Sequence, residues 1–264
     1  MGNVCCIRSV KKVGLCMKPY QIELQVIKET VKKVLAELKN QEKEVEVKDN
    51  KDLVTIYDKT IEQRLIDAIL KKYPTDHILS EETHQFTPLD GRCWIIDPID
   101  GTTNFVVGLP LYCIQVALYE YDDLQLSYLY LPVLDKEYTA VKGHGATLNG
   151  VPIKTLKHQT LSNSLASFVG LSRNPNQLMK DALNQTIDKN MKIRTLGSVG
   201  VELAFVAEGI SMACYTNVKN IWDIAPGILL CKEAGAYNPI NAYEMGIDPL
   251  FIWGNKEAYE LFKK

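Results

Sequence analysis

Residues 94–105, with the sequence WIIDPIDGTTNF, constrain the possible fold of this chain more than any other stretch. The first three residues are bulky or β-branched, which is typical of a buried strand. Pro98 has no N–H and fixes φ, so the hydrogen-bonded ladder of that strand cannot continue through it. Gly101 tolerates positive φ and allows another group to approach the backbone closely. We therefore expect a buried strand that ends in a sharp bend.

Two carboxylates, Asp97 and Asp100, lie in this bend, three positions apart. Their spacing allows both side chains and an intervening carbonyl to converge on one point, an arrangement of oxygen ligands that suits Mg²⁺ or Mn²⁺. Thr102 and Thr103 are predicted to begin a helix, whose free N–H groups attract a phosphate. An Asx-turn followed by an ordinary helix cap would explain the same residues without any metal.

The composition is that of an ordinary soluble globular protein, with 46% hydrophobic and 23% charged residues. The 264 residues can form one large domain or two smaller ones. A net charge of −2 gives no electrostatic reason to expect nucleic-acid binding, and no apolar run is long enough to span a bilayer. The seven cysteines form no CxxC pair, which indicates reduced thiols and a cytoplasmic location.

Residues 1–16 do not share the pattern of the rest of the chain. They begin MGNVCC, which is similar to an acylated N-terminus, but Cys6 stands where the myristoylation pattern requires Ser or Thr. The segment is too short and too weakly apolar for a secretory signal. We expect an unstructured leader. A membrane anchor through Gly2, Cys5 and Cys6 is the alternative, and cell fractionation against a chain that starts at Met17 would separate the two.

The complete string of residues 94–105 closely resembles the metal-binding signature of the inositol monophosphatase family of Mg²⁺-dependent, lithium-sensitive phosphatases. Two further acidic segments follow the family's order: ILSEETH at 78–84 resembles its second metal element, and NIWDIAPGILLCKEAGA at 220–236 resembles its C-terminal signature. Ser80 replaces the usual glycine, and Pro226 replaces a residue that is usually alanine. Serine is small and proline is tolerated in a first helical turn, so we expect both segments to keep their acids in place.

The periodicity of the chain predicts its secondary structure in two parts. In the first part we expect a helix at 20–38, a strand over 53–56, a helix at 61–70 capped by Asp58, a strand before the acids at 78–84, and β-rich segments at 111–121, 124–131, 137–141 and 146–153. In the second part we expect alternating segments at 166–169, 177–190, 192–196, 199–208 and 212–215. Short connections imply an antiparallel sheet in the first part, and alternation implies an α/β layer in the second.

The resemblance implies a sandwich of alternating α, β, α, β and α layers. We expect an α+β half at residues 17–155, which holds the antiparallel sheet and most metal ligands, and an α/β half at residues 156–264, which holds the last ligand.

Roles for individual residues are also implied by the resemblance. The implied metal ligands are Glu81, Asp97, the Ile99 carbonyl, Asp100 and Asp223, which would hold two or three Mg²⁺ ions, with Mn²⁺ as a substitute. The implied catalytic residues are Glu81, Thr102 and Asp58; the last belongs to KDLVTIYDKT, residues 51–60, which resembles the family's DLVTxxD element. The implied substrate-binding residues are Asp100, Gly101, Thr102, Thr103 and Asp223.

Simpler interpretations remain for several of these acids. Glu81 and Glu82 are also compatible with a solvated loop. Asp223 is favoured near a helix N-terminus by the helix dipole alone, and Asp58 needs no role beyond a helix cap.

The implied activity is hydrolysis of a small phosphate monoester, similar to inositol monophosphate, by metal-assisted in-line attack of water. Thr216 and Asn220 stand where inositol-specific members have a glutamate and a histidine. Fructose 1,6-bisphosphate, 3′-phosphoadenosine 5′-phosphate and NADP are therefore alternative substrates. A non-catalytic protein that binds a metal or a phosphorylated metabolite is the alternative from another class. The resemblance also implies a homodimer.

Overall fold

The computed structural model describes residues 19–39, 45–47, 53–157, 160–171, 176–218, 220–238 and 250–263. The expected leader at residues 1–16 lies outside this part of the chain, and the division of the chain at residue 155 stays a prediction. Within the described ranges, no helix is both long enough and apolar enough to cross a membrane.

The larger sheet has seven strands in the order β3-β4-β5-β6-β7-β8-β9. They are His77–Ser80, Cys93–Asp100, Cys113–Glu120, Asp123–Leu131, Lys136–Val141, Ala146–Leu148 and Val151–Ile153. All neighbours are antiparallel except β3 and β4, which run parallel. The parallel register pairs Ser80 with Ile96, so the carboxyl ends of these two strands meet at one edge. Glu81, which directly follows β3, therefore lies near Asp97.

Strand β4 continues beyond the point where we expected it to end. All eight of its residues are buried, and it runs through Pro98 to Asp100. The pairing with β5 shifts register between Asp97, which lies opposite Gln115, and Asp100, which lies opposite Cys113. A bulge of this kind tolerates proline, because the residue there does not need to donate a ladder hydrogen bond.

The smaller sheet has four strands in the order β11-β10-β12-β13. They are Lys192–Arg194, Leu165–Val169, Ala213–Thr216 and Leu250–Trp253. Strand β10 runs parallel to both of its neighbours, and β13 closes the edge in the antiparallel direction. The alternation of strands and helices predicted after residue 161 is confirmed. A separate two-stranded antiparallel sheet pairs β1, Val45–Val47, with β2, Leu53–Thr55.

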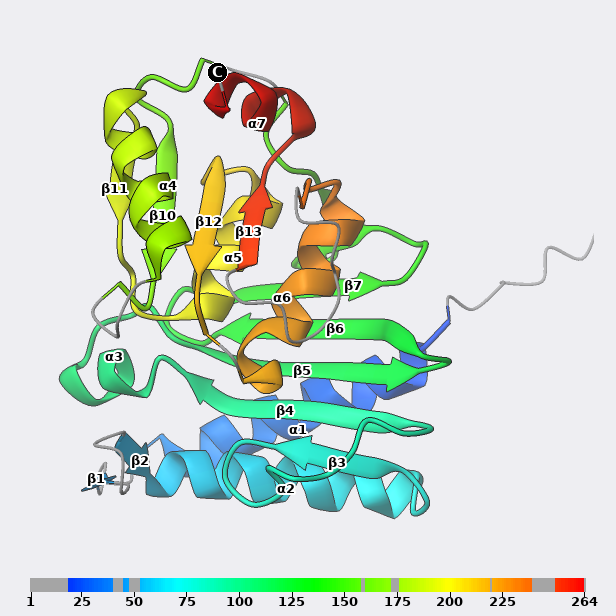
Figure 1. The fold of residues 1–264 in the computed structure, drawn as a ribbon. Coiled ribbons are helices and arrows are strands. Elements are labelled where there is room, and N and C mark those ends of the chain that lie inside the picture. Colours follow the sequence, from blue (N-terminus) through cyan, green and yellow to red (C-terminus); the bar gives the residue numbers. More distant parts are fainter. Residues whose placement is uncertain are drawn as a thin grey trace, which may run out of the picture.

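The helices form layers above, between and below the two sheets (Figure 1). They are α1 Gln21–Leu38, α2 Ile56–Lys72, α3 Thr102–Val107, α4 Gln177–Asp188, α5 Val199–Glu208, α6 Ile221–Ala234 and α7 Lys256–Phe262. Helices α1 and α2 pack together against the outer face of the seven-stranded sheet, α5 and α6 lie between the sheets, and α4 and α7 cover the smaller sheet. This confirms the expected five-layer sandwich, and each interface between layers buries a cluster of hydrophobic side chains.

The start of α2 differs from our expectation, because Asp58 is not its N-cap. The helix begins at Ile56, and Thr55 is the N-cap residue. The Thr55 hydroxyl accepts the N–H of Tyr57 at 3.1 Å and that of Asp58 at 3.4 Å, while the Asp58 carboxylate accepts the Thr55 N–H at 2.7 Å. This is a reciprocal capping box. The β-branched Ile56 resembles a continuation of the strand. The capping box outweighs the low helix propensity of Ile56, so this residue begins the helix instead.

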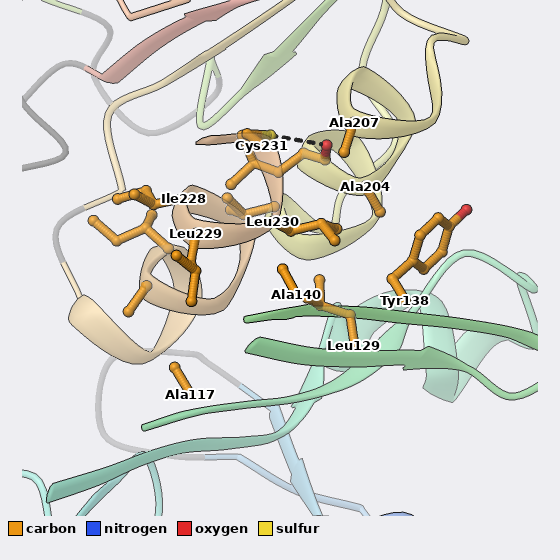
Figure 2. Packing of buried hydrophobic residues seen from close by; sticks show 14 of the residues in the cluster. Ala117, Leu129, Tyr138, Ala140, Ala204, Ala207, Ile228, Leu229, Leu230 and Cys231 are labelled. Atoms are coloured by element: carbon orange, nitrogen blue, oxygen red, sulfur yellow. Dashed lines mark hydrogen bonds between the residues drawn. The ribbon is translucent and has the colours of Figure 1, made fainter. Parts of the chain in front are cut away.

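Helices α5 and α6 approach each other closely between the two sheets. Figure 2 shows Cys231 of α6 directed toward α5, where its thiol lies 3.2 Å from the Leu203 carbonyl oxygen. In the same view, Leu129 and Ala140 of the larger sheet lie on the side of the sheet that faces these helices. This close approach depends on Gly227, because a Cβ there would lie 2.4 Å from Cδ1 and 2.8 Å from Cβ of Leu203.

The substitution Gly227→Ala is expected to destabilise the protein. In an open helix this change would stabilise by about 1 kcal/mol, but overpacking of a close interface costs about 1–3 kcal/mol. We expect a lower urea midpoint for the variant. The double variant Gly227→Ala, Leu203→Ala should lose less stability than the sum of the losses in the two single variants, because the added methyl group then has space. A Gly227→Ala protein as stable as the wild type would contradict the packing described.

Candidate active site

Three carboxylates converge where β4 meets the first turn of α6. Asp97 and Asp100 come from β4 and Asp223 from α6, and each offers a ligand oxygen within 4.8 Å of the others. Glu81, directly after β3, is not part of this group of three but lines the same pocket. The pocket is also lined by Ile99, Gly101, Thr102 and Thr103, so the fold brings together all of the predicted metal-binding and substrate-binding residues.

The electrostatics of the cluster are unfavourable without a cation. Burial, followed by the charges of Glu81, Asp100 and Asp223, raises the pKa of Asp97 well above its usual range. Burial together with the charges of Asp100 and Glu81 likewise raises the pKa of Asp223. The Oδ1 atom of Asp97 is buried and has no hydrogen-bond partner within the described part of the chain. Like charges in a desolvated site repel strongly, so this donor set fits a hard divalent cation.

Asp100 is held by the N-terminal turn of α5. Its carboxylate accepts the Ser198 hydroxyl at 2.5 Å, the Gly200 N–H at 2.5 Å and the Val199 N–H at 3.2 Å. Burial raises the pKa of Asp100, and these hydrogen bonds oppose that shift because they favour the charged form. Ser198, Val199 and Gly200, at the start of α5, therefore orient a predicted metal ligand.

Gln115 is a site residue that the sequence analysis missed. It is fully buried in β5, and its Nε2 donates to Asp97 Oδ2 at 3.3 Å and to the Asp223 carbonyl oxygen at 3.0 Å. It thereby links β4 to the start of α6. A glutamine inside the apolar run CIQVAL of β5 was the available signal, since a buried amide is normally there to satisfy other polar groups.

Helix α6 places Asp223 in its first turn, as predicted. Pro226 was expected in that turn as well, and this expectation is wrong: α6 starts at Ile221, so Pro226 is the sixth residue of the helix. There it removes the hydrogen bond that its N–H would have donated to the Trp222 carbonyl. The Pro226 carbonyl accepts the Ser127 hydroxyl of β6 at 2.6 Å. Asp223 precedes the proline and still reaches the cluster.

The short helix α3 begins directly after the bend. Gly101 has φ of 91°, as its position in the bend required, and a Cβ there would lie 2.9 Å from the Ser198 Cβ. The Thr102 hydroxyl lies 3.4 Å from Asp58 Oδ1 and 3.0 Å from the Ile99 carbonyl oxygen. Asp58 therefore reaches the edge of the site through Thr102, although it does not line the pocket.

The two positions expected to distinguish substrates differ in their placement. Asn220 lines the pocket, whereas Thr216 is fully buried at the end of β12, where its hydroxyl accepts the Val218 N–H at 3.1 Å. Beside Gly197, which lines the pocket, Glu202 of α5 accepts the Leu196 N–H at 2.6 Å, and burial raises the pKa of Glu202 to about 7. The other described residues that line the pocket are uncharged: Asn104, Val169, Gly170, Thr195, Gly197, Val199, Val218 and Asn220.

A profile described as the inositol monophosphatase family matches residues 18–239. The chain belongs to the inositol monophosphatase family. It is accordingly a phosphoric monoester hydrolase of a family that uses Mg²⁺ and acts on small phosphorylated metabolites. The cluster of Asp97, Asp100 and Asp223 agrees with that use of Mg²⁺.

Three similar proteins illustrate the range within the inositol monophosphatase family. The inositol monophosphatase of Dictyostelium discoideum is 36% identical over 222 residues, which cover 81% of this chain and 82% of that protein. A fructose-1,6-bisphosphatase/inositol-1-monophosphatase of Aquifex aeolicus is 32% identical over 238 residues, with coverage of 89% and 88%. The crystal structure of an IMPase/NADP phosphatase complexed with Mg²⁺ and phosphate has a TM-score of 0.78 and 26% identity, with coverage of 93% and 95%.

Proposed function

We propose that this inositol monophosphatase family member hydrolyses a small phosphate monoester of the inositol monophosphate type. The observation that carries the proposal is the convergence of Asp97, Asp100 and Asp223, with Glu81 in the same pocket. The first relative named above is an inositol monophosphatase, and it aligns with 81% of this chain.

Each acid has a proposed role at the site. Glu81, Asp97, Asp100, Asp223 and the Ile99 carbonyl would hold Mg²⁺. When bound, Mg²⁺ neutralises the crowded carboxylates, stabilises the charge on the phosphate and leaving oxygen, and lowers the pKa of water. Mn²⁺ has similar ligand preferences and would substitute.

The protein's own groups would bind the phosphate and orient the attacking water. The N–H groups of Gly101 and Thr102, which begin α3, would hold the phosphate, with Thr103 beside them. Glu81 faces the same space, and the Thr102 hydroxyl with Asp58 would accept and direct the proton of the water. The water would attack the phosphorus in line with the departing alcohol oxygen.

Other phosphorylated substrates follow from specific observations. The second relative is named a fructose-1,6-bisphosphatase as well as an inositol-1-monophosphatase, and the structural neighbour is named an NADP phosphatase. Apart from the predicted metal ligands, the described residues that line the pocket, Asn220 among them, include no acid that could bind sugar hydroxyls. Fructose 1,6-bisphosphate, NADP and 3′-phosphoadenosine 5′-phosphate are therefore the alternatives.

A phosphate-release screen with and without Mg²⁺ tests the proposal. Inositol 1-phosphate and the three alternatives should be compared at equal concentration, with chelator-treated enzyme as the blank. We expect the largest kcat/KM for inositol 1-phosphate. A larger value for another substrate would reassign the specificity, and no Mg²⁺-dependent release from any of them would favour a binding protein without turnover.

We also propose a homodimer, inhibition by lithium and a cytoplasmic location, on the basis of family membership alone. Light scattering, a lithium titration of phosphate release, and cell fractionation test these three properties separately.

A further inference from the structure

Glu62 is a fully buried acid of α2 that has no place in the site described above. It lies one helical turn after Asp58, so both carboxylates project from the same face of α2. The Oε2 atom of Glu62 accepts the Glu82 N–H at 2.8 Å, and Oε1 accepts the Thr83 hydroxyl at 2.5 Å. Each oxygen thus has its own donor, and both donors belong to the turn that follows β3.

That turn carries Glu81, and the backbone on both sides of Glu81 is fixed. Before it, Ser80 pairs with Ile96 of β4, and the Glu81 N–H donates to the Ile96 carbonyl at 3.2 Å. After it, Glu62 holds the Glu82 N–H and the Thr83 hydroxyl. The turn then closes with a bridge between Ser80 and His84. Glu62 thus ties this turn to α2.

We propose that Glu62 is a positioning residue that presents Glu81 to the divalent cation; this rests on the metal-ligand role given to Glu81 under the proposed function. Burying a carboxylate is unfavourable unless its oxygens are fully hydrogen-bonded. Here both donors come from the residues directly after a ligand, so the carboxylate holds the backbone that sets where Glu81 lies. Mutation of residues that hydrogen-bond to metal ligands typically lowers metal affinity by about 10–100-fold.

The substitution Glu62→Gln separates positioning from simple packing. A glutamine of the same shape can accept from only one of the two donors, since its amide NH₂ would face the other. We expect the variant to bind Mg²⁺ roughly 10–100-fold more weakly in calorimetric titrations of the whole chain. Phosphate release should recover as the Mg²⁺ concentration is raised. The Mg²⁺ concentration that gives half-maximal activity should be higher than for the wild type, while kcat at saturating Mg²⁺ should be close to the wild-type value.

Two further variants keep the test decisive if Glu62→Gln folds poorly. Thr83→Val removes one donor at the turn and should weaken Mg²⁺ binding in the same direction, while Thr83→Ser retains the hydroxyl and should restore it. Asp67→Asn is the matched control, because Asp67 lies on the exposed face of the same helix and contacts only the exposed Gln63 side chain in the described hydrogen bonds.

The outcomes distinguish this inference from the proposed function. If the wild-type chain takes up no Mg²⁺, the metal assignment itself fails. If the wild type binds Mg²⁺ and the Glu62→Gln and Thr83→Val variants bind it equally well, the positioning role of Glu62 is wrong. A loss of thermal stability without any change in Mg²⁺ affinity would assign Glu62 to packing alone and overturn the proposal.

Discussion

Asp223→Asn should abolish most Mg²⁺-dependent release of phosphate, with a fall of roughly 100-fold or more, since even outer partners of metal ligands contribute about 10–100-fold. Asparagine has nearly the same shape as aspartate but lacks the anionic oxygen that a hard cation requires. Of the three clustered aspartates, Asp223 alone comes from α6, so the variant would lose the link that a bound cation would make between that helix and β4. Initial rates over a Mg²⁺ titration provide the measurement.

The Asp223→Asn variant should remain folded, because removing one charge from a crowded cluster relieves repulsion. Circular dichroism and thermal unfolding in chelator check this directly. Asp181→Asn, on the exposed face of α4, is the matched control and should retain full activity. Wild-type rates in the Asp223→Asn protein would refute the assignment of Asp223 as a ligand.

Mg²⁺ should stabilise the protein increasingly as the pH rises from acidic to neutral. Burial and mutual repulsion raise the pKa values of Asp97 and Asp223 in the fold above those of the unfolded chain. A raised carboxyl pKa contributes stability at low pH, and this contribution is lost as the pH rises through the folded-state pKa. The metal-free protein should therefore lose stability over this range, while a bound cation stabilises the charged carboxylates.

The test is to measure, as a function of pH, the difference in free energy of unfolding between Mg²⁺-loaded and chelator-treated protein. At a free Mg²⁺ concentration 100 times its dissociation constant, Mg²⁺ raises the free energy of unfolding by about 2.7 kcal/mol. Glu202, with a pKa raised to about 7, titrates in the same direction, but its contribution occurs with and without Mg²⁺ and cancels in the difference. Calorimetry in two buffers of different ionisation enthalpy should also detect protons released on Mg²⁺ binding. A stability gap that is independent of pH, with no proton release, would contradict the cluster described.

The types and approximate positions of most described elements were predictable from the sequence. Strand β4 and helices α1, α5 and α6 follow from runs of apolar residues or from helical periodicity, which are local properties of the chain. The errors were also local. Asp58 was expected to cap α2, because the β-branched Ile56 resembles a strand residue. Pro226 was expected in the first turn of α6, but it is the sixth residue of that helix.

The acids of the site could be named in advance because each lies in a short recognisable string at the end of a strand or the start of a helix. Their supporting residues could not be named, since those contacts join distant parts of the chain. Gln115 donates to a carbonyl 108 residues away, and Ser198 donates to an acid 98 residues away. Glu62 likewise contacts a turn about 20 residues later, with no motif to mark it. Local spacing encodes which carboxylates are available, whereas the packing of β4 against α2, α5 and α6 sets how each one is held.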